Sequence, residues 1–482
     1  GLPGIFRVEL LPEGAHPLDV RYNVIHWVHR ATRGWSYGGY LTDPRTGEIV
    51  RGNVLLGSLR VRQDRMIFEG LVGAEQSGTG GANDPIQTAL ARIRQLAAHE
   101  VGHAIGLAHN MAASTQSRAS VMDYPAPEVA IDERGELDLS DAYAVGVGAW
   151  DRLAIRALYG NEDPEAVMRD GIARGLIFVG DAHSRAGGSG HPEGALWDTG
   201  SDSVESLRHQ MRVRRLALER FAERALPDGR PRAELRERLV PIYLFHRYQA
   251  EAAAKKVGGI RFNYGTATDG SSASTIVPAN EQWAALDAVL DCVTPEALDL
   301  PDELVAMLDP HEPNLLLPGV SRELFRPTLD PAFDVTSAAD AGAAIVLGAL
   351  LHHDRLARID ELFQRDPGLP SLDAVLDRVV ERLTGGASPR ETRADVLRRT
   401  TQWRVFRILA SLSSDPHSKW RVRAAADRAL ESLEARWKDE GPGGTWLRGQ
   451  AERFRERPEE AGSPAAFPVS IPPGSPIGAC GR

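Results

Sequence analysis

Positions 99–109 read His99-Glu100-Val101-Gly102-His103-Ala104-Ile105-Gly106-Leu107-Ala108-His109. Apolar residues recur at helical spacing before this stretch, which predicts one amphipathic helix over about 85–107, capped by Asp84-Pro85. His99 and His103 are four residues apart, so they lie on one face of that helix, where two imidazole nitrogens can bind one metal ion. Glu100 projects beside them, near the ion but not bonded to it.

A third imidazole is needed to complete this site. His109 lies six residues after His103 and would point elsewhere if the helix continued. Gly106 has no Cβ and can take a positive φ, so we expect it to end the helix and turn the chain until His109 reaches the ion. Three neutral imidazoles leave one tetrahedral position for water, the pattern of a catalytic zinc site. Glu100 is then the predicted general base, which later passes the proton to a leaving amine.

This string resembles the zinc signature of the metzincin metalloendopeptidases. The stretch Ser120-Val121-Met122-Asp123-Tyr124 follows it and is similar to the metzincin Met-turn, which implies that Met122 forms an apolar floor under the metal. The resemblance also implies a catalytic role for Tyr124. The astacin and serralysin branches carry a tyrosine at this place that ligates zinc or stabilises the oxyanion, whereas matrixin-like branches do without it.

More of the chain resembles the large bacterial zinc-dependent metalloproteases of a metzincin-like, formerly unknown-function family. The stretches that carry this wider resemblance are 21–25, 43–49, 99–114 and 245–249. It implies one catalytic Zn²⁺ and an exported protein, periplasmic or extracellular. Asn110 is a departure, because the best-known metzincin branches have Glu, Pro, Ser or Asp after the third histidine.

The first 80 residues predict short strands, at 6–10, 19–25 and 54–61, with hairpin turn chemistry at 42–47. The strand at 54–61 is the candidate edge strand, to which an extended peptide substrate would add. We expect no helix before the zinc helix. The long helix with which a metzincin domain normally begins is therefore expected upstream of Gly1, which would leave the catalytic domain without its N-terminal part.

The predicted fold class is α+β: a metzincin-like catalytic domain with a twisted sheet and the zinc-binding helix, followed by a mainly α-helical C-terminal region. The catalytic domain is expected to cover 1–160, because Ala157-Leu158-Tyr159-Gly160 resembles the end of the last matrixin helix. The later parts are a helical extension with Gly-rich loops near the cleft, a helical domain and a poorly structured tail, at 161–280, 281–461 and 462–482.

Two loop histidines leave alternatives open. His183 and His191 lie with Asp181 in a Gly-rich loop, where they are solvated, line the cleft or bind a second metal ion. The placement of residues 170–200 relative to the zinc ligands decides between these interpretations.

Composition excludes several classes of protein. The chain has 482 residues, 42% of them hydrophobic, and a formal net charge of −10, which is ordinary globular composition. It has no basic block, so nucleic acid is not a predicted partner. The longest apolar run, 343–351, is shorter than the ~20 residues of a membrane-spanning helix, so no span is predicted. Cys292 and Cys480 can form one disulfide or remain two thiols.

Three functions are compatible with this site. The predicted one is a zinc-dependent metalloendopeptidase that acts on protein or peptide substrates. The alternatives are a catalytically silent zinc-binding pseudoprotease or scaffold, and a zinc amidase that acts on a non-protein amide. Glu100 argues against the silent form, because a glutamate has little structural reason to stand there.

Overall fold

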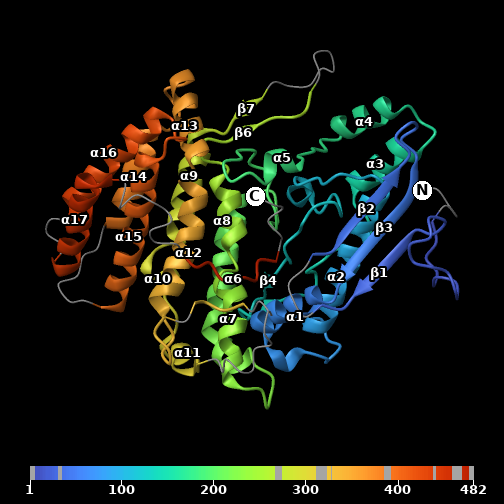
Figure 1. Cartoon of the computed structure of the whole chain (residues 1–482), viewed down its shortest axis with the longest axis horizontal. Coiled ribbons are helices and arrows are strands. Elements are labelled where there is room, and N and C mark those ends of the chain that lie inside the picture. Colours follow the sequence, from blue (N-terminus) through green and yellow to red (C-terminus); the bar gives the residue numbers. More distant parts are fainter. Residues whose placement is uncertain are drawn as a thin grey trace.

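The computed structural model describes residues 6–30, 35–265, 274–310, 323–326, 328–384, 392–437, 441–458 and 469–476. Figure 1 shows a sheet-containing part, in blue and teal, beside a helical part in green to red. This helix-rich chain with small sheets fits the predicted α+β class.

The main sheet contains β1 (Val24–Val28), β2 (Tyr37–Thr42) and β3 (Ile49–Gly57). Its order is β1-β3-β2, with β1 parallel and β2 antiparallel to β3. The turn at 43–48 joins β2 to β3 through the Asp43 N–H, which donates to the Glu48 carbonyl at 2.9 Å. The hairpin at 42–47 is therefore formed as predicted.

The other strand predictions need correction. Residues 6–10 form no strand, and the strand predicted at 19–25 begins only at Val24. The strand predicted at 54–61 ends at Gly57, and it lies in the centre of the sheet. It is therefore not an edge strand, and β2 is the antiparallel edge.

A long helix does precede the zinc helix, which the sequence analysis missed. α1 (Leu59–Val72) follows β3 directly and packs against α2 and against α6 (Ser203–Arg224). The apolar residues of β3 are followed closely by Leu59 and Val61 of α1, so no change in hydrophobicity marks the boundary at Ser58. The buried pair Arg60–Asp64, one helical turn apart, stabilises that first turn.

α2 (Pro85–Ala104) carries the predicted metal ligands. It starts at Asp84, whose carboxylate accepts the Ile86 N–H at 2.9 Å. It ends three residues before the predicted position 107. Gly106 has a φ of 92°, and the N–H of Leu107 donates to the Gly102 carbonyl at 2.9 Å. This is a Schellman ending, in which the glycine turns the chain away from the helix axis.

The helical part has its own core. Besides α6, its helices of eight or more residues are α7 (Leu235–Tyr243), α8 (Arg247–Ala254), α9 (Ala279–Asp291), α12 (Val335–Leu350), α13 (His353–Arg365), α14 (Leu372–Thr384), α15 (Arg393–Ser414), α16 (Trp420–Arg436) and α17 (Gly441–Glu456). Among the described residues, the stretch Val335–Arg365 is long and apolar enough to cross a membrane by length and composition. Half of its most apolar 18 residues are buried, and α12 packs against α8 and α15 as the core helix of a bundle does.

The end of the chain returns to the junction between the two parts. Pro472, Gly474 and Pro476 are buried, and the Arg247 guanidinium donates to the Gly474 carbonyl at 3.0 Å. Residues 469–476 are thus packed, contrary to the expectation from their composition. Cys292 is buried in the helical core, and Cys480 lies outside the described residues.

We expect Gly38→Ala to destabilise the protein more than Gly39→Ala. A Cβ at Gly38 would lie 1.9 Å from the Glu100 carbonyl oxygen of α2, whereas one at Gly39 meets nothing within 4 Å. Overpacking of this kind costs about 1–3 kcal/mol of unfolding free energy. Urea unfolding followed by tryptophan fluorescence measures it. Equal unfolding midpoints for the two variants would contradict the close strand–helix contact.

Candidate metal centre

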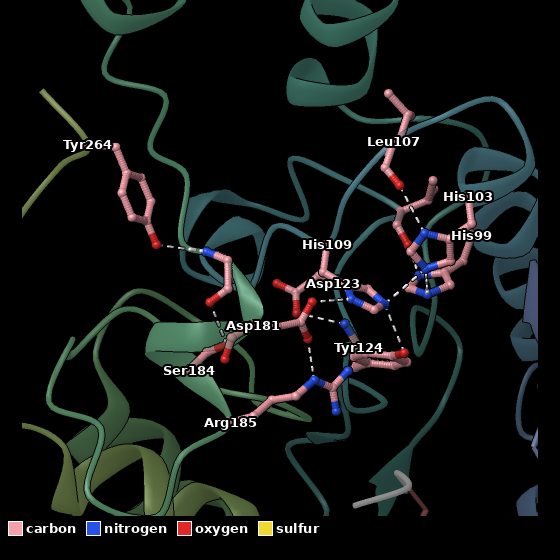
Figure 2. A network of polar contacts seen from close by, with 12 residues as sticks. His99, His103, Leu107, His109, Asp123, Tyr124, Asp181, Ser184, Arg185 and Tyr264 are labelled. Carbon is pink, nitrogen blue, oxygen red and sulfur yellow. Dashed lines mark hydrogen bonds and ion pairs between the residues drawn. The ribbon is translucent and has the colours of Figure 1, made fainter. Parts of the chain in front are cut away.

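Three imidazole rings converge at the end of α2. His99 and His103 come from α2, and His109 from the turn after Gly106 (Figure 2). The Nε2 atom of His103 lies 3.2 Å from Nε2 of His99 and 2.9 Å from Nε2 of His109. Tetrahedral zinc with Zn–N bonds of about 2.0–2.1 Å would place such atoms about 3.3 Å apart. The spacing therefore fits three nitrogen ligands of one zinc ion.

The outer nitrogen of each ring meets an oxygen atom. These contacts pair His99 Nδ1 with the Val121 carbonyl at 2.7 Å, His103 Nδ1 with the Leu107 carbonyl at 2.9 Å, and His109 Nδ1 with Asp181 Oδ2 at 2.7 Å. Carbonyl and carboxylate oxygens only accept hydrogen bonds, so each Nδ1 carries the proton and each Nε2 presents its lone pair to the shared centre. Burial lowers the pKa of His99 and His103, which favours the same neutral rings.

Glu100 directly follows His99 on α2. It is 3% exposed, and its carboxyl group accepts the backbone N–H of Gly38 from β2. Burial raises the pKa of Glu100 to about 7, although the Gly38 N–H and the charge of Arg92 act to lower it. A carboxyl group in this range can take up and return a proton near neutral pH.

Met122 lies under α2. It is buried, and its Sδ packs closely against Gly102 of α2. A Cβ added to Gly102 would lie only 2.2 Å from this sulfur, so the glycine allows the methionine to approach the helix. Asp151 of α3 (Ala149–Tyr159) anchors the turn, because its carboxylate accepts Ser120 Oγ–H at 2.5 Å and the Val121 N–H at 2.9 Å.

Tyr124 reaches the same centre. Its hydroxyl lies 2.9 Å from Nε2 of His109, and its backbone carbonyl accepts the Trp197 N–H at 2.7 Å. The guanidinium of Arg185 lies over the phenol ring, with its central carbon 4.9 Å from the ring centroid. The ring is therefore fixed with its hydroxyl toward the imidazoles (Figure 2).

Part of the site comes from beyond residue 160, where the sequence predicts the catalytic domain to end. Asp181 lies on α5 (Asp181–Ser184), 72 residues after His109, and no local spacing connects the two residues. Asn110 was noticeable in the sequence because the best-known metzincin branches have another residue at this position. It is fully buried and binds the segment that leads to α5.

The two loop histidines do not join the three imidazoles. His183 Nδ1 lies 2.9 Å from the Tyr264 hydroxyl, and His191 Nε2 lies 2.9 Å from the Phe262 carbonyl. Both rings therefore contact the segment that follows β6 (Ile260–Arg261).

A second group of possible ligands occurs within the described residues, at His352, His353 and Asp354. It is more open, and His352 Nδ1 already accepts the Asp354 N–H at 3.3 Å at the start of α13. The pKa of His352 is lowered, first by burial and then by the positive charges of His353, Arg355 and Arg358. Neighbouring arginines oppose a bound cation, so the centre at α2 is the better metal site.

Two buried carboxyl groups lie behind the Met-turn. The N–H of Ser114 donates to Asp123 at 2.7 Å, and its hydroxyl donates to Asp198 at 3.0 Å. Burial raises the pKa of both aspartates, and the charge of Asp198 raises that of Asp123 further. The folded protein therefore holds protons here that an unfolded chain would release.

Comparison with known families supports the metzincin resemblance. A family model described as Met-zincin matches residues 81–388, which include α2, the Met-turn, α5 and much of the helical part. The resemblance predicted from the zinc signature is thereby confirmed. Neither a curated protein nor a solved structure matches the chain.

We expect Asp198→Asn to make stability less dependent on pH. The folded-state pKa of both aspartates lies above the unfolded value of 3.8, so their contribution to stability falls as the pH rises above that value. Asp198→Asn removes one of the two titrating carboxyl groups, and with it the charge that raises the pKa of Asp123, so less stability is lost as the pH rises. Thermal unfolding of the metal-free protein at about pH 5 and about pH 8 measures it, with exposed Asp228→Asn as the control. The same pH dependence in Asp198→Asn as in the wild type would contradict the shift.

Proposed function

The chain belongs to the Met-zincin family, and on that premise we propose that it is a zinc-dependent metalloendopeptidase that hydrolyses peptide bonds in protein or peptide substrates. The observation that carries this proposal is the convergence of three Nε2 lone pairs at the end of α2, the helix on which the buried Glu100 directly follows His99. We propose one catalytic Zn²⁺, held by His99, His103 and His109.

The proposed chemistry divides between the ion and the chain. Bound Zn²⁺ supplies a Lewis acid that activates a water molecule and polarises the scissile carbonyl. Glu100 takes a proton from the attacking water, whose oxygen bonds to the carbonyl carbon. It then returns the proton to the amide nitrogen as the C–N bond breaks. The Tyr124 hydroxyl, directed at the same centre, donates a hydrogen bond to the developing oxyanion.

We propose that the substrate backbone adds along the outer edge of β2. This strand is antiparallel to β3 at one edge of the sheet, and Gly38 holds it against α2 at Glu100. A peptide paired with β2 would run past Glu100 in extended form. We propose this edge in place of the strand predicted at 54–61, because β3 is paired with β1 on one side and with β2 on the other.

Export to the periplasm or the exterior is a further proposal, made on resemblance alone. The silent pseudoprotease and the zinc amidase remain the functional alternatives. Their products distinguish them from a peptidase: the pseudoprotease cleaves nothing, and the zinc amidase releases an amine from a non-protein amide.

We expect Glu100→Gln to bind zinc and to lose about 10²–10⁴-fold in peptide hydrolysis, because it removes the proton acceptor but keeps the side-chain shape. Casein or gelatin zymography with and without a chelator measures this. Exposed Glu133→Gln is the control. Cleavage that resists the chelator, or equal cleavage by Glu100→Gln, would reject the peptidase. Zinc binding without peptide cleavage would favour one of the alternatives.

We expect Tyr124→Phe to lower kcat by about 10²-fold with little change in KM, because phenylalanine keeps the ring and removes the oxyanion donor. Steady-state kinetics on a fluorogenic peptide gives both values. Tyr22→Phe, which lies before β1, serves as the control. An unchanged kcat would show that the Tyr124 hydroxyl only packs beside His109.

A further inference from the structure

His109 differs from the other two imidazoles in its outer partner. His99 and His103 donate to backbone carbonyls, whereas the Nδ1–H of His109 donates to the carboxylate of Asp181 at 2.7 Å. A carboxylate acceptor makes a stronger hydrogen bond than a neutral carbonyl and so fixes the orientation of the ring more firmly. The third imidazole is therefore the one whose metal affinity depends most on a side chain.

The other oxygen of Asp181 is also bound. Arg185 Nε donates to Oδ1, while the same guanidinium lies over the ring of Tyr124. The carboxylate is thus held in one orientation between Arg185 and His109 (Figure 2). A fixed carboxylate loses little rotational freedom when it orients the imidazole.

The chain before α5 is held by the residue that follows the third histidine. Asn110 donates from Nδ2 to the Ile177 carbonyl at 2.9 Å and accepts the Val179 N–H at 3.1 Å. The N–H of Met111 adds a bond to the Val179 carbonyl at 2.8 Å. The turn that carries His109 and the segment that leads to Asp181 are therefore joined directly.

The two ends of α5 are held by the helical part. The N–H of Gly180 donates to the Tyr264 hydroxyl at 3.2 Å. At the other end the fully buried Lys255, next to α8, donates to the Ser184 carbonyl at 2.7 Å. α5 lies between the two parts of the molecule (Figure 1). These contacts set its position between the two parts.

We propose that Asp181 is a positioning residue that holds His109 with its Nε2 toward the metal and tightens zinc binding. The proposal rests on the proposed function, because it assigns His109 as a zinc ligand. It places a necessary part of the metal centre in the segment 177–185, outside the catalytic domain predicted from the sequence.

The test measures zinc affinity by competition with a chromophoric chelator, using the full chain and its Asp181→Asn, Asp181→Ala and Asp181→Glu variants. We expect Asp181→Ala and Asp181→Asn to bind zinc about 10- to 100-fold more weakly. Asp181→Glu, which keeps the charge, recovers part of the loss. Asp170→Asn on α4 (Pro164–Ala173) is the matched control, since Asp170 makes only long surface contacts with arginines.

The metal-free proteins distinguish positioning from a general structural role. The Asp181 side chain is 45% exposed, so its removal is expected to leave the thermal midpoint of the metal-free protein close to that of the wild type. A midpoint that falls together with zinc affinity would overturn the proposal. Wild-type zinc affinity in all Asp181 variants would also overturn it, whereas a wild-type chain that binds no zinc would refute the proposed function itself.

Discussion

The candidate metal centre depends on three hydrogen bonds that fix the imidazole rings. Each Nδ1–H is bound to an oxygen, and only for that reason do the three Nε2 lone pairs face one point. The acceptors come from separate places: the Met-turn supplies the Val121 carbonyl, the end of α2 supplies that of Leu107, and α5 supplies Asp181. The surrounding structure brings these three oxygen atoms to the imidazole rings at the end of α2.

The local part of this arrangement is predictable from sequence, because it follows from the geometry of one helix. The four-residue spacing places His99 and His103 together, and Gly106 marks where the helix must end. Asp181 and Gly38 were not predictable as parts of the site, since the chain brings them there only through tertiary packing. α1 was missed for another reason: apolar residues lie on both sides of Ser58, so the end of β3 and the start of α1 look alike in the sequence.

The sheet and the zinc helix constrain each other through backbone contact. Gly38 packs its Cα against the Glu100 carbonyl, and its N–H binds the Glu100 side chain. The proposed general base, Glu100, is therefore held by β2, which lies before the region matched by the Met-zincin family model. An account of the site confined to the matched residues would leave Glu100 without its strand partner.

The helical part is more than a support attached after a finished catalytic domain. Lys255 and Tyr264 hold the two ends of α5, and α5 presents Asp181 to His109. Lys255 is fully buried, where it donates to the Ser184 and Gly194 carbonyls and pairs with Glu251 at 3.6 Å, so the loss of the Ser184 contact would cost a buried charge one of its partners. A chain cut near residue 160 would keep the three histidines but lose the carboxylate that orients one of them. The metal centre is thus a property of both parts of the chain.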